Sequence, residues 1–241
     1  MAAPGLSVVI AARDEARRLP ALLSQLAGAP ELVREVWLVD GGSRDGTPRL
    51  ASLAGARVLH SPPGRGRQLA LGARQVSGPW LLLLHADVRL PAGWAERLAA
   101  VLASDRSRAR AWYFQLAIAA RSPALRLVEG AVRLRSRWRQ QPYGDQGQQQ
   151  PRVAVGLLLP LALYRAVGGV RPLPLMEDLD LVLRLARRAR LCSLGLALRV
   201  DGRRWQRQGV WRTSWSNLQL RRAWRRGVPA ELLAQRYYGC F

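Results

Sequence analysis

Residues 35–48 read EVWLVDGGSRDGTP and pass from apolar residues to turn-forming residues. The apolar run Glu35–Val39 predicts a short buried strand. Gly41–Gly46 predicts a turn, because glycine, serine and aspartate accept backbone conformations that other residues avoid. Thr47 followed by Pro48 is typical of the N-cap and first position of a helix. A strand, a short turn and a helix therefore follow one another here.

The same alternation of strand and helix is repeated before and after these residues. Leu6–Ala12 predicts a strand followed by a helix near 15–27, and Trp80–Leu84 predicts a strand followed by a helix from Pro91. Further strands are predicted at 56–59, 111–119 and 194–200, and further helices from the turn at 62–67 to about 76 and at 123–138, 161–167 and 176–190, with 153–163 suited to either. Apolar strands joined to helices by short connections predict an α/β fold: a Rossmann-like, mostly parallel sheet with helices on both faces.

The composition is that of a folded, strongly basic protein. Of its 241 residues 49% are apolar, and 38 Lys+Arg against 16 Asp+Glu give a net charge of +22. This length and apolar content suffice for a hydrophobic core, and we expect a single domain over 1–241. All 38 cationic residues are arginine, which indicates a coding bias more than a selected binding patch. The charge still favours phosphates, whether in nucleotides, nucleic acid or anionic lipid surfaces.

Several classes of protein are disfavoured by what the sequence lacks. No run reaches the ~20 apolar residues of a membrane-spanning helix, and the first residues do not resemble a signal peptide, so we expect a cytoplasmic protein. Two cysteines, Cys192 and Cys240, exclude a disulfide framework, and two histidines offer no zinc-binding spacing. Neither a P-loop nor a GxGxxG after the first strand is present, which argues against P-loop kinases and Rossmann oxidoreductases.

Acidic residues stand at the ends of two predicted strands. Asp40 and Asp87 both follow such strands, and ligands of parallel α/β sheets bind at the carboxyl ends of the strands. Asp40 either accepts hydrogen bonds from a base or ribose, or caps its own turn. Asp87 suits Mg²⁺ or Mn²⁺, which prefer oxygen ligands and bridge phosphates. His85 precedes it by two residues, and for this side chain packing is favoured over metal ligation.

Charged residues also gather at two predicted helix starts. Gly64–Arg67 combines free helix N–H groups with two guanidinium groups, which suits a diphosphate but also describes a solvated basic turn. Glu177, Asp178 and Asp180 open the helix at 176–190, where the helix dipole by itself favours acidic residues. Asp180 is two residues from Asp178 and cannot share its helix face. One carboxylate facing a cleft would suit general-base chemistry on a hydroxyl group.

Taken in order, these motifs resemble glycosyltransferase family 2, which has the GT-A fold. The resemblance covers nearly the whole chain, from about Leu6 to Tyr238. Its four main motifs are Ser7–Glu15, Val39–Thr47, Leu84–Asp87 and Met176–Asp178. The stretches Gly64–Gly72, Tyr143–Gly147 and Arg203–Trp211 are similar to a compact bacterial subgroup with poorly defined acceptors.

The resemblance implies an inverting glycosyltransferase of the hexosyltransferase type, with a nucleotide-sugar donor and a divalent cation, Mg²⁺ or Mn²⁺. It implies a nucleotide-binding half at about 1–104 and an acceptor-side half at about 105–241. On the donor side it implies a nucleoside pocket of Ala12, Arg13 and Glu15, a base contact at Asp40, a diphosphate contact at Arg67 and a metal ligand at Asp87. Elsewhere it implies Asp178 as the catalytic base, Glu177, Asp145 and Gln146 on the acceptor side, and the pair Arg204 and Trp205 near the diphosphate.

The chain departs from the family pattern at two places. Many relatives have two or more carboxylates where this chain has only Asp87 after His85, so the chain offers fewer metal ligands here than those relatives do. Gln148–Val155 has the character of an insertion beside the expected acceptor cleft.

Three questions stay open at the level of sequence. Trp211, Trp215 and Leu218 share a helical face beside several arginines. That segment either packs on the core or lies at the inner face of an anionic membrane, where it would present a lipid acceptor. The charge alone is also compatible with a non-catalytic basic module that binds nucleotides or nucleic acid, although no nucleic-acid-binding motif is present. A nucleotidyltransferase is an intermediate alternative.

Overall fold

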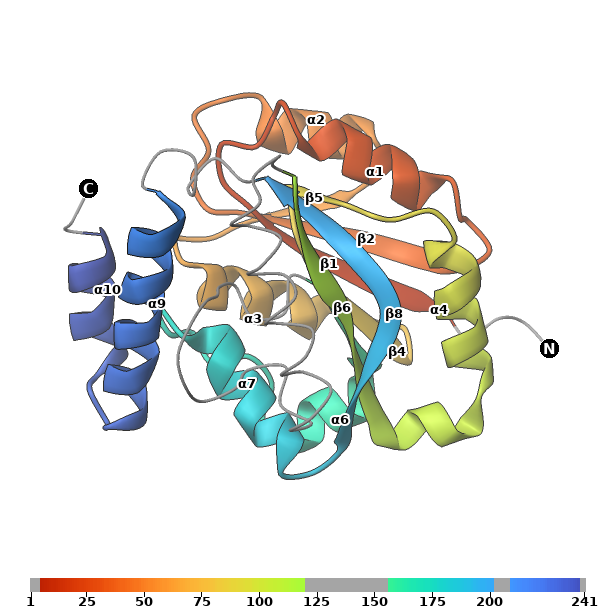
Figure 1. The fold of residues 1–241 in the computed structure, drawn as a ribbon. Coiled ribbons are helices and arrows are strands. Elements are labelled where there is room, and N and C mark those ends of the chain that lie inside the picture. Colours follow the sequence, from red (N-terminus) through yellow and green to blue (C-terminus); the bar gives the residue numbers. More distant parts are fainter. Residues whose placement is uncertain (1–4, 120–155, 202–208, 239–241) are drawn as a thin grey trace.

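The structure is a computed structural model that describes residues 5–119, 156–201 and 209–238. Its eight strands form a single sheet in the order β3-β2-β1-β4-β7-β6-β8-β5 (Figure 1). The strands are β1 (Leu6–Ala12), β2 (Val33–Asp40), β3 (Arg57–His60), β4 (Trp80–His85), β5 (Val88–Arg89), β6 (Arg110–Ala119), β7 (Gly156–Pro160) and β8 (Arg190–Asp201). The helices are α1 (Leu19–Ala27), α2 (Thr47–Leu53), α3 (Arg65–Gln75), α4 (Trp94–Ala103), the 3₁₀ turn η1 (Asp105–Ala109), α6 (Leu161–Ala166), α7 (Glu177–Ala186), α9 (Val210–Arg225) and α10 (Ala230–Tyr238).

The sheet is mostly parallel, as the sequence predicts. Strands β3, β2, β1 and β4 run parallel, β7 pairs antiparallel with both β4 and β6, and β5 pairs antiparallel with β8. Because β7 is antiparallel to both β4 and β6, strand β6 runs in the same direction as β4. Strand β8 is parallel to β6 and therefore also runs in this direction. The carboxyl ends of β1, β2, β3, β4, β6 and β8 therefore all face one edge of the sheet. Strands from 1–104 and from 105–241 share this sheet, while the division into two functional halves stays a prediction.

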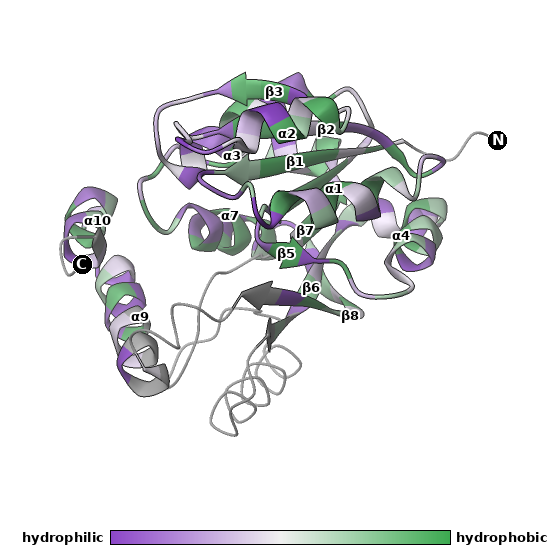
Figure 2. Cartoon of the chain, turned by 90° about the horizontal axis from the view of Figure 1, so that it is seen from above, coloured by the Kyte–Doolittle hydropathy of each residue, from purple (hydrophilic) through white to green (hydrophobic). Residues whose placement is uncertain are grey.

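Two hydrophobic cores lie on opposite faces of the sheet. Helices α1, α2 and α4 supply side chains to the core on one face, and α3, α6, α7, α9 and α10 supply them to the other. In α1, the leucines expected on the inner face, Leu19, Leu22, Leu23 and Leu26, are all buried. The strands are hydrophobic through most of their length, whereas α9 mixes hydrophilic and hydrophobic residues (Figure 2). The predicted layering, with helices on both faces, is confirmed.

The structure corrects the sequence at several element boundaries. Gly46, not Thr47, occupies the N-cap of α2, because the Thr47 hydroxyl is instead bonded to Asp45 within the preceding turn. Strand β8 begins at Arg190, ahead of the predicted Leu194, and 156–160, which the sequence left open between strand and helix, is a strand. The predicted helix at 123–138 lies outside the described residues. None of the described helices has the length and apolar character required to cross a membrane.

At the amino edge of the sheet, away from the strand carboxyl ends, Glu35 of β2 is bonded to β1 and to the connection that precedes β4. Its carboxylate accepts hydrogen bonds from the Ser7 hydroxyl at 2.7 Å, the Ser77 N–H at 2.7 Å and the Trp37 indole N–H at 3.0 Å. Burial alone would raise the pKa of Glu35, but the hydrogen bonds prevail and lower it to about 2. Glu35 is therefore a charged residue that stabilises the amino edge of the sheet.

Candidate active site

The carboxyl edge of the sheet brings several predicted site residues into register. Ala12 at the end of β1 pairs with Asp40 at the end of β2, and Asp40 pairs with His60 at the end of β3. On the other side, the neighbouring Ala11 pairs with His85 of β4. The strand order reverses between β1 and β4, and such a switch point is where α/β sheets bind their ligands.

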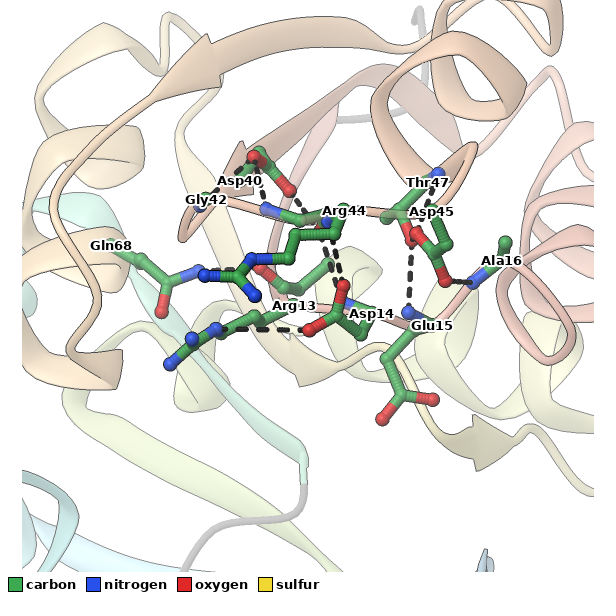
Figure 3. Close-up of polar contacts among 12 residues, drawn as sticks. Arg13, Asp14, Glu15, Ala16, Asp40, Gly42, Arg44, Asp45, Thr47 and Gln68 are labelled. Atoms are coloured by element: carbon green, nitrogen blue, oxygen red, sulfur yellow. Dashed lines mark hydrogen bonds and ion pairs between the residues drawn. The ribbon is translucent and has the colours of Figure 1, made fainter.

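The loops after β1 and β2 are joined to each other by hydrogen bonds between backbone and side chains (Figure 3). Asp14, with a φ of 54°, begins this contact. The bonds run from the Asp14 N–H to Ser43 Oγ at 2.9 Å, from the Arg44 N–H to Asp14 Oδ1 at 2.7 Å, from the Glu15 N–H to Thr47 Oγ1 at 2.9 Å and from the Ala16 N–H to Asp45 Oδ2 at 3.0 Å. The two loops therefore form one preorganised surface, although each is short and polar.

Asp40 shapes the turn that follows it. The residue is 2% exposed, and its Oδ2 accepts hydrogen bonds from the N–H groups of Gly42 and Ser43, both at 3.0 Å. The Ser43 hydroxyl donates to the other carboxylate oxygen, and His60 Nδ1 lies 3.6 Å from Oδ2. The capping contacts considered from the sequence are thus formed. The predicted contact of Asp40 with a nucleobase stays a prediction.

Gln68 is a site residue that the sequence reasoning missed. It lies on α3, is buried, and its Nε2 donates to the carbonyls of Ala12 at 2.8 Å and Val39 at 2.7 Å. A Cβ at Gly41 would stand 3.0 Å from this amide nitrogen, so the glycine allows the close approach. Gln68 holds the ends of β1 and β2 together. The only signal in the sequence was a glutamine directly after the basic turn that opens the predicted helix.

Arginines surround the same edge. Arg13 is exposed, with its Nε 3.8 Å from Asp14 Oδ2, and Arg67 near the start of α3 is also exposed. In Figure 3 the guanidinium groups of Arg13 and Arg44 extend to the same side of the loops. Glu15, the third residue of the predicted nucleoside pocket, accepts a hydrogen bond from Arg18 at 3.2 Å. Cations placed this way suit an anionic ligand such as a diphosphate.

The acidic start of α7 lies beside the basic start of α3. Glu177 and Asp178 are the first two residues of α7, and Arg65, the first residue of α3, donates to both carboxylates. The Arg65 Nη2–Asp178 Oδ2 distance is 3.0 Å. Met176, which precedes them, has a φ of 67°, a conformation that is costly for a bulky residue and often found at functional sites.

Burial changes the acidity of Asp178. Its side chain is 11% exposed, and this desolvation raises the pKa of its carboxyl to about 7, assisted by the charge of Glu177 and opposed by Arg65. A carboxyl group whose pKa lies near neutral pH is suited to act as a general base.

Asp180, two residues further along α7, has different partners from Asp178. It is buried and pairs with Arg184, at 2.6 Å, and with Arg171, at 3.2 Å. Arg184 also donates to the carbonyl of Gly169 at 2.7 Å. This network fixes α7 to the turn that precedes it.

The described part of the chain offers few side chains that could bind a metal ion. Within residues 5–119, 156–201 and 209–238, no cluster of three or more His, Cys, Asp or Glu side chains could hold a metal ion. Asp87 is partly buried in the turn after β4, and His85 is buried, which agrees with packing. A cation held at Asp87 would therefore need further oxygen ligands from a bound substrate and water, as Mg²⁺ commonly does.

Some predicted site residues lie outside the described residues. These are Asp145, Gln146, Arg204 and Trp205, together with the apparent insertion Gln148–Val155. The chain leaves β6 after Ala119 and enters β7 at Gly156, both at the carboxyl edge.

Two sequence comparisons show which known proteins this chain is similar to. The sequence model of the family described as "Glycosyl transferase family 2" matches residues 7–111. A TPR repeat-containing protein from Synechococcus elongatus is 38% identical over 89 residues, which are 35% of this chain and 21% of that protein. The chain thus spans about a fifth of the length of that curated relative.

Solved structures resemble the fold over most of the chain. One is glucosyl-3-phosphoglycerate synthase from Mycobacterium tuberculosis with Mn²⁺, UDP-glucose and phosphoglyceric acid, at 19% identity and a TM-score of 0.60 over 93% of this chain and 80% of that one. The same synthase has been solved with Mg²⁺ and UDP. Another is TarS (residues 1–349) from S. aureus, at 15% identity and a TM-score of 0.61 over 82% of this chain and 60% of that one. The chain therefore has the GT-A fold of these enzymes, and its residues 7–111 are similar to glycosyl transferase family 2.

Proposed function

We propose that this chain is an inverting glycosyltransferase that moves a sugar, a hexose, from a nucleotide-diphosphate donor to a hydroxyl acceptor. The observation that carries the proposal is the position of Asp178, a largely buried carboxylate with a raised pKa beside the basic start of α3. The match of residues 7–111 to glycosyl transferase family 2 supports the reaction class.

The donor is assigned to the joined loops after β1 and β2. In this assignment Ala12, Arg13, Glu15 and Asp40 line the nucleoside pocket, and Arg67 meets the diphosphate. The mycobacterial synthase binds UDP and UDP-glucose in its solved structures, which makes uridine donors the first to test. The exposed arginines at this edge match the charge of such a donor.

The transfer step follows from the chemistry of a single displacement. The acceptor oxygen attacks the anomeric carbon from the face opposite the nucleoside diphosphate, and the bond from that carbon to the phosphate oxygen breaks with its electron pair. Asp178 takes the proton of the acceptor hydroxyl, and Glu177 lies beside it on the acceptor side. The arginine charge stabilises the departing diphosphate, where negative charge develops. One displacement inverts the configuration at the sugar carbon.

A divalent cation, Mg²⁺ or Mn²⁺, fits this site only together with the donor. Asp87 is a hard oxygen ligand of the type these ions prefer, but it is a single carboxylate without a described cluster around it. The donor diphosphate would complete the ligand set. When bound, such a cation neutralises charge on the diphosphate.

A donor screen tests the proposal. The chain is incubated with a panel of nucleotide sugars and Mn²⁺, and the release of nucleoside diphosphate is measured, with melting temperatures recorded alongside because ligands that bind the folded state raise them. We expect one donor to give nucleoside diphosphate. Binding without any turnover would instead support the non-catalytic nucleotide-binding alternative, and pyrophosphate release would indicate a nucleotidyltransferase.

Contact with an anionic membrane is part of the proposal for a lipid acceptor. The outward side of α9 and its end carries Arg212, Trp215, Gln219, Arg222 and Arg226, all exposed, and Trp215 is 60% exposed. Leu218 is buried, so it packs on the core and does not share this exposed face with Trp215. An indole flanked by guanidinium groups suits a lipid headgroup region.

Vesicle sedimentation tests this contact. We expect the chain to pellet with vesicles that contain anionic lipid, and the double variant Trp215→Ser/Arg222→Gln to pellet several-fold less. The matched control is Leu53→Ser/Arg49→Gln on α2, which removes an equally exposed apolar residue and one charge from another face. Equal losses in both double variants would show that net charge alone drives the binding.

A further inference from the structure

Arg65 connects the two halves of the site. It is the first residue of α3, directly after Gly64, and its guanidinium reaches α7, 112 positions further along the chain. Its Nε donates to Glu177 Oε1, and its Nη2 donates to Asp178 Oδ2 at 3.0 Å. The side chain is 27% exposed, so these bonds form in a partly water-excluded position.

Close packing of the backbone brings the two helix starts together. A Cβ on Gly66 would stand 2.7 Å from the carbonyl oxygens of both Arg171 and Leu173, in the segment that leads into α7. That segment then turns through the left-handed Met176 before α7 begins. Arg65 therefore faces the acidic pair because of main-chain packing, not because of a flexible excursion of its side chain.

The bonds of Asp178 fix the direction of its carboxylate. Oδ1 accepts the N–H of Leu179 at 2.7 Å, while Oδ2 accepts from Arg65. The planar fork of an arginine places two donors at a fixed separation, which a lysine cannot do. With both oxygens engaged, the remaining lone pairs of Asp178 point in a defined direction.

Arg65 is also the cation that compensates the acidic pair. The charged groups that act on Asp178 in the described part of the chain are Glu177 of its own helix and Arg65 of α3. Glu177 is almost fully buried beside Asp178, so little water screens the two carboxylates from each other. Without Arg65, a buried pair of like charges would lack its counter-charge.

We propose that Arg65 is a positioning residue for the base: it orients the carboxylate of Asp178 and supplies its counter-charge, while Arg67, on the same turn, serves the donor. This inference rests on the proposed function, and it adds a residue whose role is distinct from diphosphate binding. It also explains why the first arginine of the Gly64–Arg67 motif faces inward and the second is exposed.

The test is a titration of Asp178 in the variant Arg65→Met. The carboxyl signals of the chain labelled with ¹³C at aspartate are followed by NMR against pH, and Asp178→Asn assigns the signal. We expect the pKa of Asp178 to rise by about one unit or more when Arg65 is lost, because an opposite charge within ~4–6 Å shifts a carboxyl by about 1–3 units. Arg67→Met is the matched control and should leave this titration unchanged.

Turnover provides a second readout. In Arg65→Met we expect kcat at pH 7 to fall about fivefold for a one-unit shift, because the base of the parent is already half protonated at this pH, and to recover at higher pH, with the donor KM changed less than about threefold. Arg65→Lys should restore part of the titration but less of kcat. A raised donor KM with an unchanged kcat and an unchanged titration would overturn the proposal and make Arg65 a donor-binding residue.

The two proposals fail in different ways. If no donor gives turnover, the proposed function fails, while the titration still decides whether Arg65 controls the ionisation of Asp178. If Arg65→Met does not fold, Arg65→Met/Glu177→Gln is compared with Glu177→Gln, since the like charge is then absent from both. An equal pKa of Asp178 in those two variants would overturn the proposal.

Discussion

Asp178→Asn is expected to lower sugar transfer about 10³-fold, with the affinity for nucleoside diphosphate changed less than about threefold. Asparagine keeps the size and the contact with the Leu179 N–H but cannot take a proton, and removal of a general base costs about 10²–10⁴-fold. The measurement is nucleoside diphosphate release under saturating donor, with binding measured separately. Glu231→Gln, an exposed acidic residue in the first turn of α10, is the matched control and should retain full activity.

The same variant should be more stable than the parent at pH 8. The pKa of Asp178 is about 7 in the folded protein and 3.8 as a free group, so the unfolded chain binds fewer protons between these values. The stability of the parent therefore falls as pH rises from about 4 to 7 and stays reduced above that. Asparagine escapes this loss, and the melting temperature of Asp178→Asn should exceed that of the parent at pH 8 but not at pH 3.5. Full activity, or an equal melting temperature at pH 8, would contradict the role of Asp178.

Gly72→Val is expected to have the largest effect on folding. A Cβ at Gly72 would stand 2.5 Å from Val9 Cγ1 and 2.9 Å from Val39 Cγ2, so α3 lies directly on β1 and β2 only because this residue has no side chain. Overpacking there should lower the free energy of unfolding by about 3 kcal/mol or more. For a chain of this size that corresponds to a fall in melting temperature of about 6–12 °C.

The displacement of α3 should also impair the site. Gln68 and Arg65 lie on this helix, and both must reach partners outside it. Gly46→Ala is the control, because Gly46 has a φ of −77° and a Cβ there meets nothing within 4 Å. Thermal unfolding compares the variants. If the melting temperature of Gly72→Val fell no further than that of Gly46→Ala, the tight packing of α3 on the sheet would be contradicted.

The local pattern of the sequence predicts most of the fold because strands and helix faces are local properties. Apolar runs such as Leu6–Ala12 and Trp80–Leu84 lie in the sheet, and the periodic leucines of α1 lie in the core. The errors fall at element ends, where hydrogen bonds compete. Thr47 was expected to cap α2, but its hydroxyl bonds instead to Asp45 and accepts the Glu15 N–H from another loop.

For the site, the sequence predicts which strand ends carry carboxylates but not what those carboxylates contact. Asp40 and Asp87 were located by the rule that parallel strands end at one edge. Gln68 was missed, because its two partners are backbone carbonyls 29 and 56 positions away. Arg65 was noticed only as half of a basic turn, because its partners are supplied by a helix more than a hundred residues away.

The amino-acid sequence by itself thus determined the order of most strands and helices, the resemblance to a family and the set of ionisable side chains, since each of these depends on residue type and short spacing. Only the tertiary structure decided that the arginine at the start of α3 meets the carboxylates at the start of α7. It did so through glycines at positions 66 and 72, which let a helix approach both the sheet and the segment before α7. Burial by tertiary packing is the main cause of the raised pKa of Asp178, and the charge of its sequence neighbour Glu177 adds to it.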